Sequence, residues 1–230
     1  EINKIESNKL EIEYINFNLK QLLGDIQNSL KEIATINNNK FILKIDPAIP
    51  ENLIGDPTKL SQIFMNLINN ALKFTNNGTV SVLTRLRSHQ NDNATIFFQI
   101  TDTGIGIPED KLKTVFESFS QGSVEINRKF GGTGLGLTIV KKLVRILGGR
   151  IRLKSIVGEG STFSFELNFK VDKRPLPNKV VIKNYNPEIF KDKKILVVED
   201  NKINQMITQK MLTNKAMKCT IIDNGEEAIQ

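Results

Sequence analysis

The residues best suited to bind a phosphorylated ligand lie in a glycine-rich loop that leads directly into a helix. The stretch FGGTGLGLTIVKKL, residues 130–143, places four glycines before its apolar residues take up a helical spacing. The first N–H groups of a helix have no partner within it and form the positive end of its dipole, and glycine lets an anion come close. The loop therefore favours a phosphate site, although loops of this composition also serve as turns or hinges.

A stripe of amide side chains is the second element. Asp56 followed by Pro57 marks a helix start, and the apolar residues that follow fall on one face at about 100° per residue. Asn66, Asn70 and Lys73 lie on a neighbouring stripe of the same helix. An amide oxygen suits Mg²⁺, which accepts few protein ligands, and a lysine can meet a phosphate as a point charge.

A single carboxylate at a strand end is the third element. Asp102 closes the predicted strand ATIFFQITD and is followed by TGIGIPED, a turn that contains Gly104 and Gly106. The carboxylate could accept a hydrogen bond from an adenine amino group, and the glycines would let the ring approach. Taken separately, the carboxylate could be a helix cap, the amides surface residues and the glycines a hinge. Together, in this order, the three elements favour a magnesium–nucleotide site.

Alternating and helical patterns predict an α/β scaffold around these residues. Besides the helix that starts at Asp56–Pro57, we expect helices at 20–36 and 135–147, and Gly148 ends the latter. The predicted strands are 15–19, 40–46, 79–86, 94–102, 150–156 and 161–169. The stretch RSHQNDN, residues 87–93, reads as an exposed loop and holds the only histidine, His89.

Composition limits the class of protein. The 230 residues are 39% hydrophobic and 25% charged, which is ordinary for a globular protein. No apolar run approaches the roughly 18 residues of a membrane span and no secretory leader is visible, so we expect a cytoplasmic location, with any membrane anchor upstream. The one cysteine, Cys219, fits a reducing compartment. The net charge of +7 comes from scattered side chains, which favours solvated surface over nucleic-acid binding.

Four segments resemble, in order, the sequence boxes of the sensor histidine kinase ATP-binding domain. They are NLINNALKFT (66–75), DTGIGIP (102–108), VFESFSQ (115–121) and GGTGLGL (131–137), and GEGSTFSFEL (158–167) resembles the closing hairpin. The resemblance covers about residues 13–170. It implies a Bergerat-type two-layer α/β sandwich, a mixed sheet with helices on one face, with ATP between the asparagine helix and the two glycine segments.

The resemblance also implies roles for individual residues. Asn70 would bind Mg²⁺ with Asn66 close by, Lys73 would assist the phosphates and Asp102 would bind adenine; the first three form the expected catalytic set. The remaining expected nucleotide-binding residues are Gly104, Gly106, Ile107, Arg128, Lys129, Gly132, Thr133, Gly134, Leu135, Gly136, Leu137 and Thr162. Residues 118–130 would form a lid, in which Arg128 and Lys129 could equally be solvated charges.

The side chain at position 66 bears on the type of reaction. Gyrase-type topoisomerases and MutL-type repair proteins share the implied fold and place a glutamate there, which activates water. Asn66 cannot accept a proton at neutral pH, so the sequence favours phosphoryl transfer to a protein side chain over hydrolysis. Residues 1–12 resemble the end of the second helix of a dimerisation hairpin, whose first helix would carry the accepting histidine. His89 does not match that acceptor context.

The C-terminal part of the chain has a pattern of its own. After a predicted linker, 171–192, residues 193–230 read as strand, helix and strand, and KILVVEDNKINQMI resembles the start of a flavodoxin-like response-regulator receiver domain. Glu199 and Asp200 would be its acidic pair for Mg²⁺. The phosphate-accepting aspartate would lie beyond Gln230, so this site would be incomplete and the segment poorly stable alone.

We therefore expect the ATP-binding catalytic part of a hybrid sensor histidine kinase in two-component phosphorelay signalling, with ATP and Mg²⁺ as cofactors. The expected protein partners are the dimerisation helix of the same or a partner protomer, a receiver domain and, in the full-length parent, a second copy. A binding module of another class, an ATP-binding pseudokinase scaffold, is the alternative. A hydrolytic ATPase is less favoured because of Asn66.

Overall fold

The computed structural model describes residues 11–112, 114–117, 136–172, 190–199, 205, 208–209, 212–213 and 215–225. The chain divides into two compact units, Glu1–Pro177 and Asn178–Gln230. The sequences of all three expected nucleotide-binding elements fall in the first unit.

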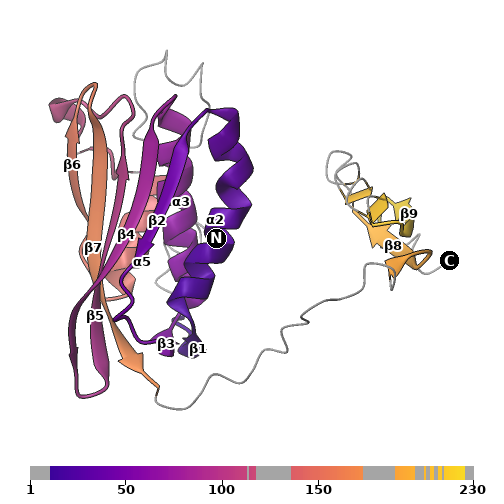
Figure 1. Cartoon of the computed structure of the whole chain (residues 1–230), viewed down its shortest axis with the longest axis horizontal. Helices are drawn as coiled ribbons and strands as arrows, with labels where there is room; N and C mark the ends of the chain where they lie inside the picture. The colour runs from indigo at the N-terminus through magenta and orange to yellow at the C-terminus, as the bar shows by residue number, and fades with distance from the viewer. Residues whose placement is uncertain are drawn as a thin grey trace. The chain divides into compact units, whose positions relative to one another are not determined.

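The first unit is built on a mixed sheet with helices packed on one face (Figure 1). Its strands are β1 (Ile15–Phe17), β2 (Lys40–Ile45), β3 (Leu53–Gly55), β4 (Thr79–Gln90), β5 (Asn93–Asp102), β6 (Arg152–Ile156) and β7 (Gly160–Val171). The order is β1-β3-β7-β5-β4-β2, and β6 also pairs with β7. β2 and β4 are parallel and all other pairs are antiparallel. The expected two-layer α/β sandwich is confirmed.

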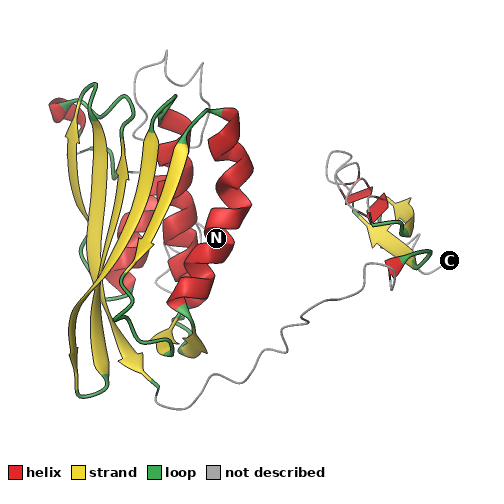
Figure 2. Cartoon of the chain, viewed as in Figure 1, coloured by secondary structure: helices red, strands yellow, loops and turns green. Residues whose placement is uncertain are grey.

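Three long helices cover the sheet in the described part of this unit: α2 (Leu19–Ile36), α3 (Pro57–Phe74) and α5 (Gly136–Ile146) (Figure 2). A short 3₁₀ helix, η1 (Glu109–Lys111), follows the turn after β5. The predicted start of α3 is confirmed, because the Asp56 side chain accepts a hydrogen bond from the Lys59 N–H and Pro57 occupies the first turn.

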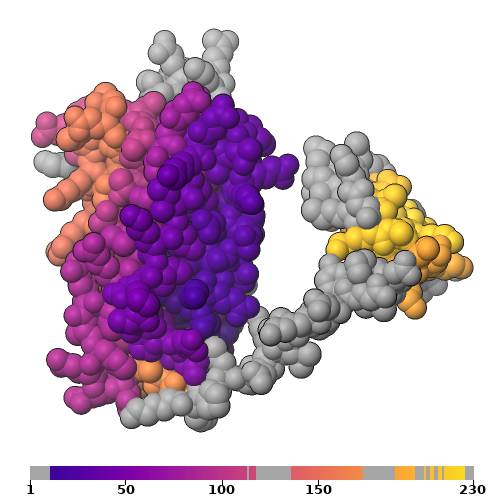
Figure 3. Space-filling view, viewed as in Figure 1, coloured from indigo at the N-terminus to yellow at the C-terminus, as the bar shows by residue number. Residues whose placement is uncertain are grey.

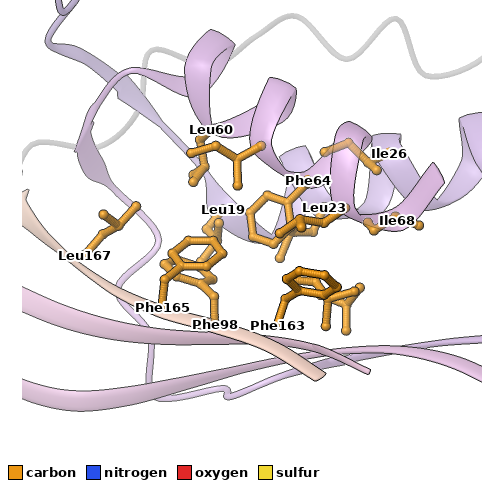
Figure 4. Close-up of a cluster of buried hydrophobic side chains, with 14 of the residues drawn as sticks. Leu19, Leu23, Ile26, Leu60, Phe64, Ile68, Phe98, Phe163, Phe165 and Leu167 are labelled. Carbon is orange, nitrogen blue, oxygen red and sulfur yellow. The ribbon is translucent and has the colours of Figure 1, made fainter. Parts of the chain in front are cut away.

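A cluster of aromatic side chains fills the space between α3 and the sheet (Figure 4). Phe98 of β5 stacks on Phe165 of β7 with ring centroids 5.0 Å apart, and Phe64 of α3 meets Phe98 edge-on at 5.5 Å. Such pairs add about 0.5–1.5 kcal/mol each beyond the burial of their apolar surface. The core therefore fixes α3 against the two strands that end at the candidate site.

The hairpin of β4 and β5 is longer than the sequence indicated. The expected loop at 87–93 is wrong, because β4 continues to Gln90 and His89 pairs with Ala94. Asn91 and Asp92 alone make the turn, with φ angles of 48° and 61°, which asparagine and aspartate tolerate and which match the twist of a two-residue hairpin. A polar, exposed ribbon can thus remain paired to its tip, with one shift of register between Leu86 and Ser88.

The second unit contains a parallel strand pair, β8 (Lys194–Val198) and β9 (Lys218–Ile222). The buried Gln205 side chain donates to the Asp223 carboxylate at 2.6 Å and so ties the connecting segment to the end of β9. Cys219 on β9 is a half-buried free thiol. The two expected strands of this segment are present, and most of the residues predicted to form the helix between them lie outside the described residues.

Candidate nucleotide-binding site

Asp102 is buried at the end of β5, with only 7% of its surface exposed. Its Oδ1 accepts hydrogen bonds from the N–H of Gly104 at 2.9 Å and of Ser161 at 3.3 Å. Within the described ranges, no group donates to Oδ2. Burial raises the pKa of the Asp102 carboxyl above its usual 3.8, against the effect of the two N–H donors. The structure thus holds one carboxylate oxygen in place and leaves the other able to accept a ligand donor.

The turn after Asp102 touches the end of α3. Ile105 N–H donates to the Phe74 carbonyl at 3.2 Å, and a Cβ placed on Gly104 would lie 2.3 Å from that carbonyl oxygen. Only glycine fits at position 104, because any side chain would overlap the α3 backbone. The adenine-binding candidate and the amide helix are therefore joined by direct backbone contact.

Asparagine side chains hold the C-terminal end of α3. Asn39 Nδ2 donates to the carbonyls of Leu72 at 3.2 Å and Thr75 at 2.7 Å, and its Oδ1 accepts from the Gly78 N–H at 3.1 Å. Asn37 Nδ2 also donates to the Leu72 carbonyl. These bonds satisfy carbonyls that the last helical turn leaves unpaired, so the end of α3 has a fixed position.

The turn after Asp102 also packs against the closing hairpin, which is formed by β6 and β7. Gly106 has a φ of +68°, and a Cβ there would lie 2.1 Å from the Ile156 carbonyl oxygen. Gly158 N–H donates to the Ile105 carbonyl at 2.9 Å, and Ile107 N–H donates to Ser155 Oγ at 2.8 Å. In the space-filling view, the closing hairpin (orange) lies directly beside the strands coloured magenta (Figure 3).

A row of polar side chains crosses three strands at this point. Asp102, Ser161 and Ser155 are direct cross-strand neighbours on β5, β7 and β6. The serines were not singled out from the sequence, where they read as ordinary polar positions of an alternating hairpin. Thr162, which was expected at the site, is not brought there: its hydroxyl lies 3.1 Å from Thr101 Oγ1 on the opposite face of the sheet.

The amide stripe of α3 meets the start of α5. A Cβ placed on Gly136 would lie 3.1 Å from Asn66 Oδ1 and 3.9 Å from Asn70 Nδ2. Asn66 Nδ2 donates to the Gln62 carbonyl one turn earlier, at 3.0 Å. Lys73, one turn further along, has its Nζ 5.0 Å from the centre of the Phe74 ring. The two sequence elements expected to bind phosphates and metal are therefore adjacent.

The segment that contains Phe116 braces α5. Thr138 of α5 donates its hydroxyl proton to the Phe116 carbonyl at 3.1 Å, and the Phe116 ring packs edge-on against Phe163 of β7 at 6.3 Å. Leu137, expected near the nucleotide, is half-buried and packs against the core. The first turn of α5 is thus held between the sheet and the segment that precedes the expected lid.

Several expected site residues lie outside the described residues. They are Arg128, Lys129, Gly132, Thr133, Gly134, Leu135 and Asp200, together with the expected lid at 118–130 and residues 1–10. Glu199 is described, and its N–H donates to the carbonyl of Ile222, the last residue of β9.

The described residues fit a purine nucleotide and suit a lightly held metal ion. Asp102 Oδ2, to which no described group donates, matches an amino group, and the close backbone contacts of Gly104 and Gly106 hold the adjoining turn in place. Within the described ranges there is no cluster of three or more His, Cys, Asp or Glu side chains that could hold a metal alone. An amide oxygen such as that of Asn70, completed by phosphate oxygens and water, agrees with the preferences of Mg²⁺.

A separate cavity of about 230 Å³ lies at the other ends of α3 and α5. Its lining is mostly apolar and includes Ile12, Tyr14 and Asp56. Asp56 accepts from the Lys59 Nζ at 2.6 Å and from the Glu13 N–H at 3.1 Å. Burial opposes its charge, but the hydrogen bonds from Lys59 and Glu13 outweigh this and hold the pKa of the Asp56 carboxyl below 3.8. Its carboxylate has a structural function as a helix cap.

Comparison with known proteins places residues 55–171 in the family model described as histidine kinase-, DNA gyrase B-, and HSP90-like ATPase. The signal transduction histidine-protein kinase BarA of Escherichia coli K12 is 36% identical over 218 residues, which cover 95% of this chain and 23% of BarA. The autoinducer 2 sensor kinase/phosphatase LuxQ of Vibrio harveyi is 34% identical over 235 residues, or 27% of its length. The chain thus spans about a quarter of the length of these relatives.

Solved structures of similar fold include a sensor histidine kinase. Full-length ShkA, solved in complex with AMPPNP, matches with a TM-score of 0.64 at 22% identity over 99% of this chain and 44% of ShkA. The mycobacterial sensor histidine kinase MprB matches with a TM-score of 0.51 at 27% identity, over 69% of this chain and 99% of the MprB chain. Among the described residues, no helix is both long and apolar enough to cross a membrane.

Proposed function

Because the chain belongs to the histidine kinase-, DNA gyrase B- and HSP90-like ATPase family, and within it to the sensor histidine kinases, we propose that its first unit binds Mg-ATP and transfers the γ-phosphoryl group to a histidine. The accepting histidine would lie on a dimerisation helix of the same or a partner protomer. Membership of the family supports an ATP-binding catalytic domain. The transfer of the phosphoryl group and the identity of its acceptor are our proposal.

The observation that carries the proposal is the contact between the amide stripe and the start of α5. Asn66 and Asn70 face Gly136, where the glycine-rich loop becomes a helix. This arrangement puts a candidate metal ligand beside N–H groups that have no partner within the helix. A polyphosphate bound there would be contacted from two sides.

At the adenine end of the proposed site, the group that would contact the base is a hydrogen-bond acceptor. Asp102 keeps Oδ2 available while its Oδ1 is occupied by the N–H groups of Gly104 and Ser161. An amino group of a purine is the donor that such an oxygen would accept. The contacts of the turn with Phe74 and Ile156 hold the carboxylate at a fixed distance from the amide stripe.

At the phosphate end, the side chains present favour transfer over hydrolysis. Asn66 is an amide, which cannot take a proton from water, and its Nδ2 is engaged with the Gln62 carbonyl. Asn70 would hold Mg²⁺, which supplies neutralisation of charge on the phosphates when bound. Lys73 would add a positive charge on the same stripe, so catalysis would rest on positioning and electrostatics.

The second unit is proposed to be the beginning of a receiver domain. Its support is the parallel pair of β8 and β9 and the position of Glu199 directly after β8. The carboxyl ends of parallel strands share one edge of a sheet, where Asp223 also lies. A hybrid kinase with a second copy as dimerisation partner follows from the same proposal.

The proposal is tested by mixing the full chain with Mg²⁺, γ-labelled ATP and a separately produced dimerisation hairpin from the same parent protein. Label on the hairpin histidine, absent when that histidine is replaced by alanine, is the expected result. Binding of Mg-ATP without transfer would contradict the kinase and favour the scaffold module. Steady phosphate release without the hairpin would contradict it in favour of the hydrolytic ATPase.

A further inference from the structure

Ser155 of β6 makes three contacts that join the separate walls of the adenine end of the site. Its Oγ donates to the Gly160 carbonyl at 2.8 Å, accepts from the Ile107 N–H at 2.8 Å, and lies 3.0 Å from Ser161 Oγ. The hydroxyl therefore connects the turn after Asp102 with the closing hairpin. The contact with Ser161 joins cross-strand partners of the β6–β7 pair, and the other two are additional to that ladder.

The proton count fixes the direction of the bond between the two serines. A hydroxyl has one proton, and that of Ser155 must go to Gly160, because a carbonyl oxygen can only accept. Ser161 must then donate its own proton to Ser155. The remaining lone pairs of Ser161 Oγ can only accept hydrogen bonds.

Ser161 and Asp102 face the same side of the sheet. They are direct partners on β7 and β5, and each shares its face with a core residue two positions away, Phe163 and Ile100. Ser161 and Asp102 are each 7% exposed, and within the described part of the chain no group donates to Asp102 Oδ2. The edge of the pocket that a base would meet therefore consists of acceptors.

We propose that Ser155 is a positioning residue for base selection: it turns the Ser161 hydroxyl into an acceptor and fixes the Ile107 backbone, so that the pocket admits an amino group and rejects a carbonyl. This inference rests on the proposed function. Adenine carries an amino group where guanine carries a carbonyl oxygen, which Asp102 Oδ2 and Ser161 Oγ would both repel. Without Ser155, the Ser161 proton is free to rotate into the pocket and meet that oxygen.

The test measures binding of Mg-ATP, Mg-GTP and inorganic tripolyphosphate to the full chain by calorimetry, with GTP by competition. Ser155→Ala should weaken Mg-ATP by about tenfold, lower the ATP-to-GTP affinity ratio by at least as much, and leave tripolyphosphate within about twofold. Ser155→Thr, which keeps the hydroxyl, should restore the ratio. Ser164→Ala, on the opposite face of β7, is the matched control and should change nothing.

The coupling between the serines supplies a second readout. In a Ser161→Ala background, Ser155→Ala should change the ATP-to-GTP ratio much less than in the wild type, because the hydroxyl that Ser155 orients is gone and only its contact with Ile107 remains. Ser155→Cys fills the same space with a weak hydrogen-bonding group, so it decides the question if the alanine variant does not fold.

The inference is overturned by an unchanged ratio in Ser155→Ala, by equal losses of ATP and tripolyphosphate, or by additive effects of the two serines. In each case the wild-type chain would still bind Mg-ATP, so the proposed function would stand. Absence of Mg-ATP binding to the wild type would instead refute the proposed function, and this inference with it.

Discussion

Replacing Asp102 by asparagine tests the adenine contact with almost no change of shape. The amide oxygen can keep the bonds from Gly104 and Ser161, which places Nδ2 where Oδ2 now lies. The lost bond to a charged acceptor costs about 1.5–3 kcal/mol, and an adenine amino group left facing a donor costs about 1–3 kcal/mol more. The sum, about 2.5–6 kcal/mol, corresponds to Mg-ATP affinity at least roughly 60-fold weaker.

The same replacement should stabilise the free protein. The folded pKa of Asp102 is raised by burial above its usual 3.8, so the stability associated with its neutral form is present below about 3.8 and is lost as the pH rises through the folded value. Asparagine does not ionise. Asp102→Asn should therefore be more stable than the wild type near pH 7, and the difference should vanish in acid.

Calorimetric titration with Mg-ATP and urea unfolding at two pH values measure both effects. Asp46→Asn is the matched control, because hydrogen bonds from the Ala48 and Leu86 N–H groups lower the pKa of Asp46. That variant should lose stability near neutral pH and keep its nucleotide affinity. Unchanged affinity in Asp102→Asn, or weaker binding accompanied by lower stability, would refute the reasoning.

Three further replacements test other parts of the structure. Asp56→Ala removes the α3 cap and should lower the free energy of unfolding, measured in urea at neutral pH, by about 1–3 kcal/mol. Because the pKa of Asp56 is lowered in the folded protein, this loss should shrink as the pH falls through the folded value. The variant should keep its affinity for Mg-ATP, and poor nucleotide binding would contradict the structural function of Asp56. Gly106→Ala should weaken Mg-ATP binding at least about tenfold, because its Cβ would lie 2.1 Å from the Ile156 carbonyl oxygen. Gly158→Ala is the control: Gly158 has a φ of +81° but open space around it, so this variant should lose stability only. Equal Mg-ATP affinities of the two variants in calorimetry would count against the contact between Gly106 and Ile156. The wild type should bind ATP more tightly with Mg²⁺ than with EDTA, and Asn70→Ala should abolish this difference. Asn69→Ala, on the same helix, should keep it. The same Mg²⁺ dependence in both variants would show that Asn70 is not the Mg²⁺ ligand.

The elements that the sequence predicted correctly are those with long periodic patterns or strong local signals. The core face of α3 follows from its 3.6-residue spacing, and Asp56–Pro57 sets its start. β3 has three residues, too few for any period to emerge, and it was missed. The extension of β4 was missed because polar, exposed strands resemble loops in composition.

Within the site, strand register decides where one expected residue, Thr162, lies. Thr162 and Ser161 are adjacent and chemically alike, but successive side chains of a strand point to opposite faces, so only Ser161 meets Asp102. Ser155 could be recognised only through its contacts with Ile107 and Gly160, which are far from it along the chain or across a turn. The approach of Gly136 to Asn66 and Asn70 likewise depends on packing that no local pattern encodes.

The two-residue turn at Asn91–Asp92 offers a place for a reporter. It lies at the tip of the β4–β5 ribbon, and β5 runs from Asn93 at this tip to Asp102 at the site. Nine steps of about 3.3 Å separate the ends of that strand, or roughly 30 Å. A dye attached there would sit within energy-transfer range of a fluorescent nucleotide, yet too far away to touch it, and could follow occupancy in real time.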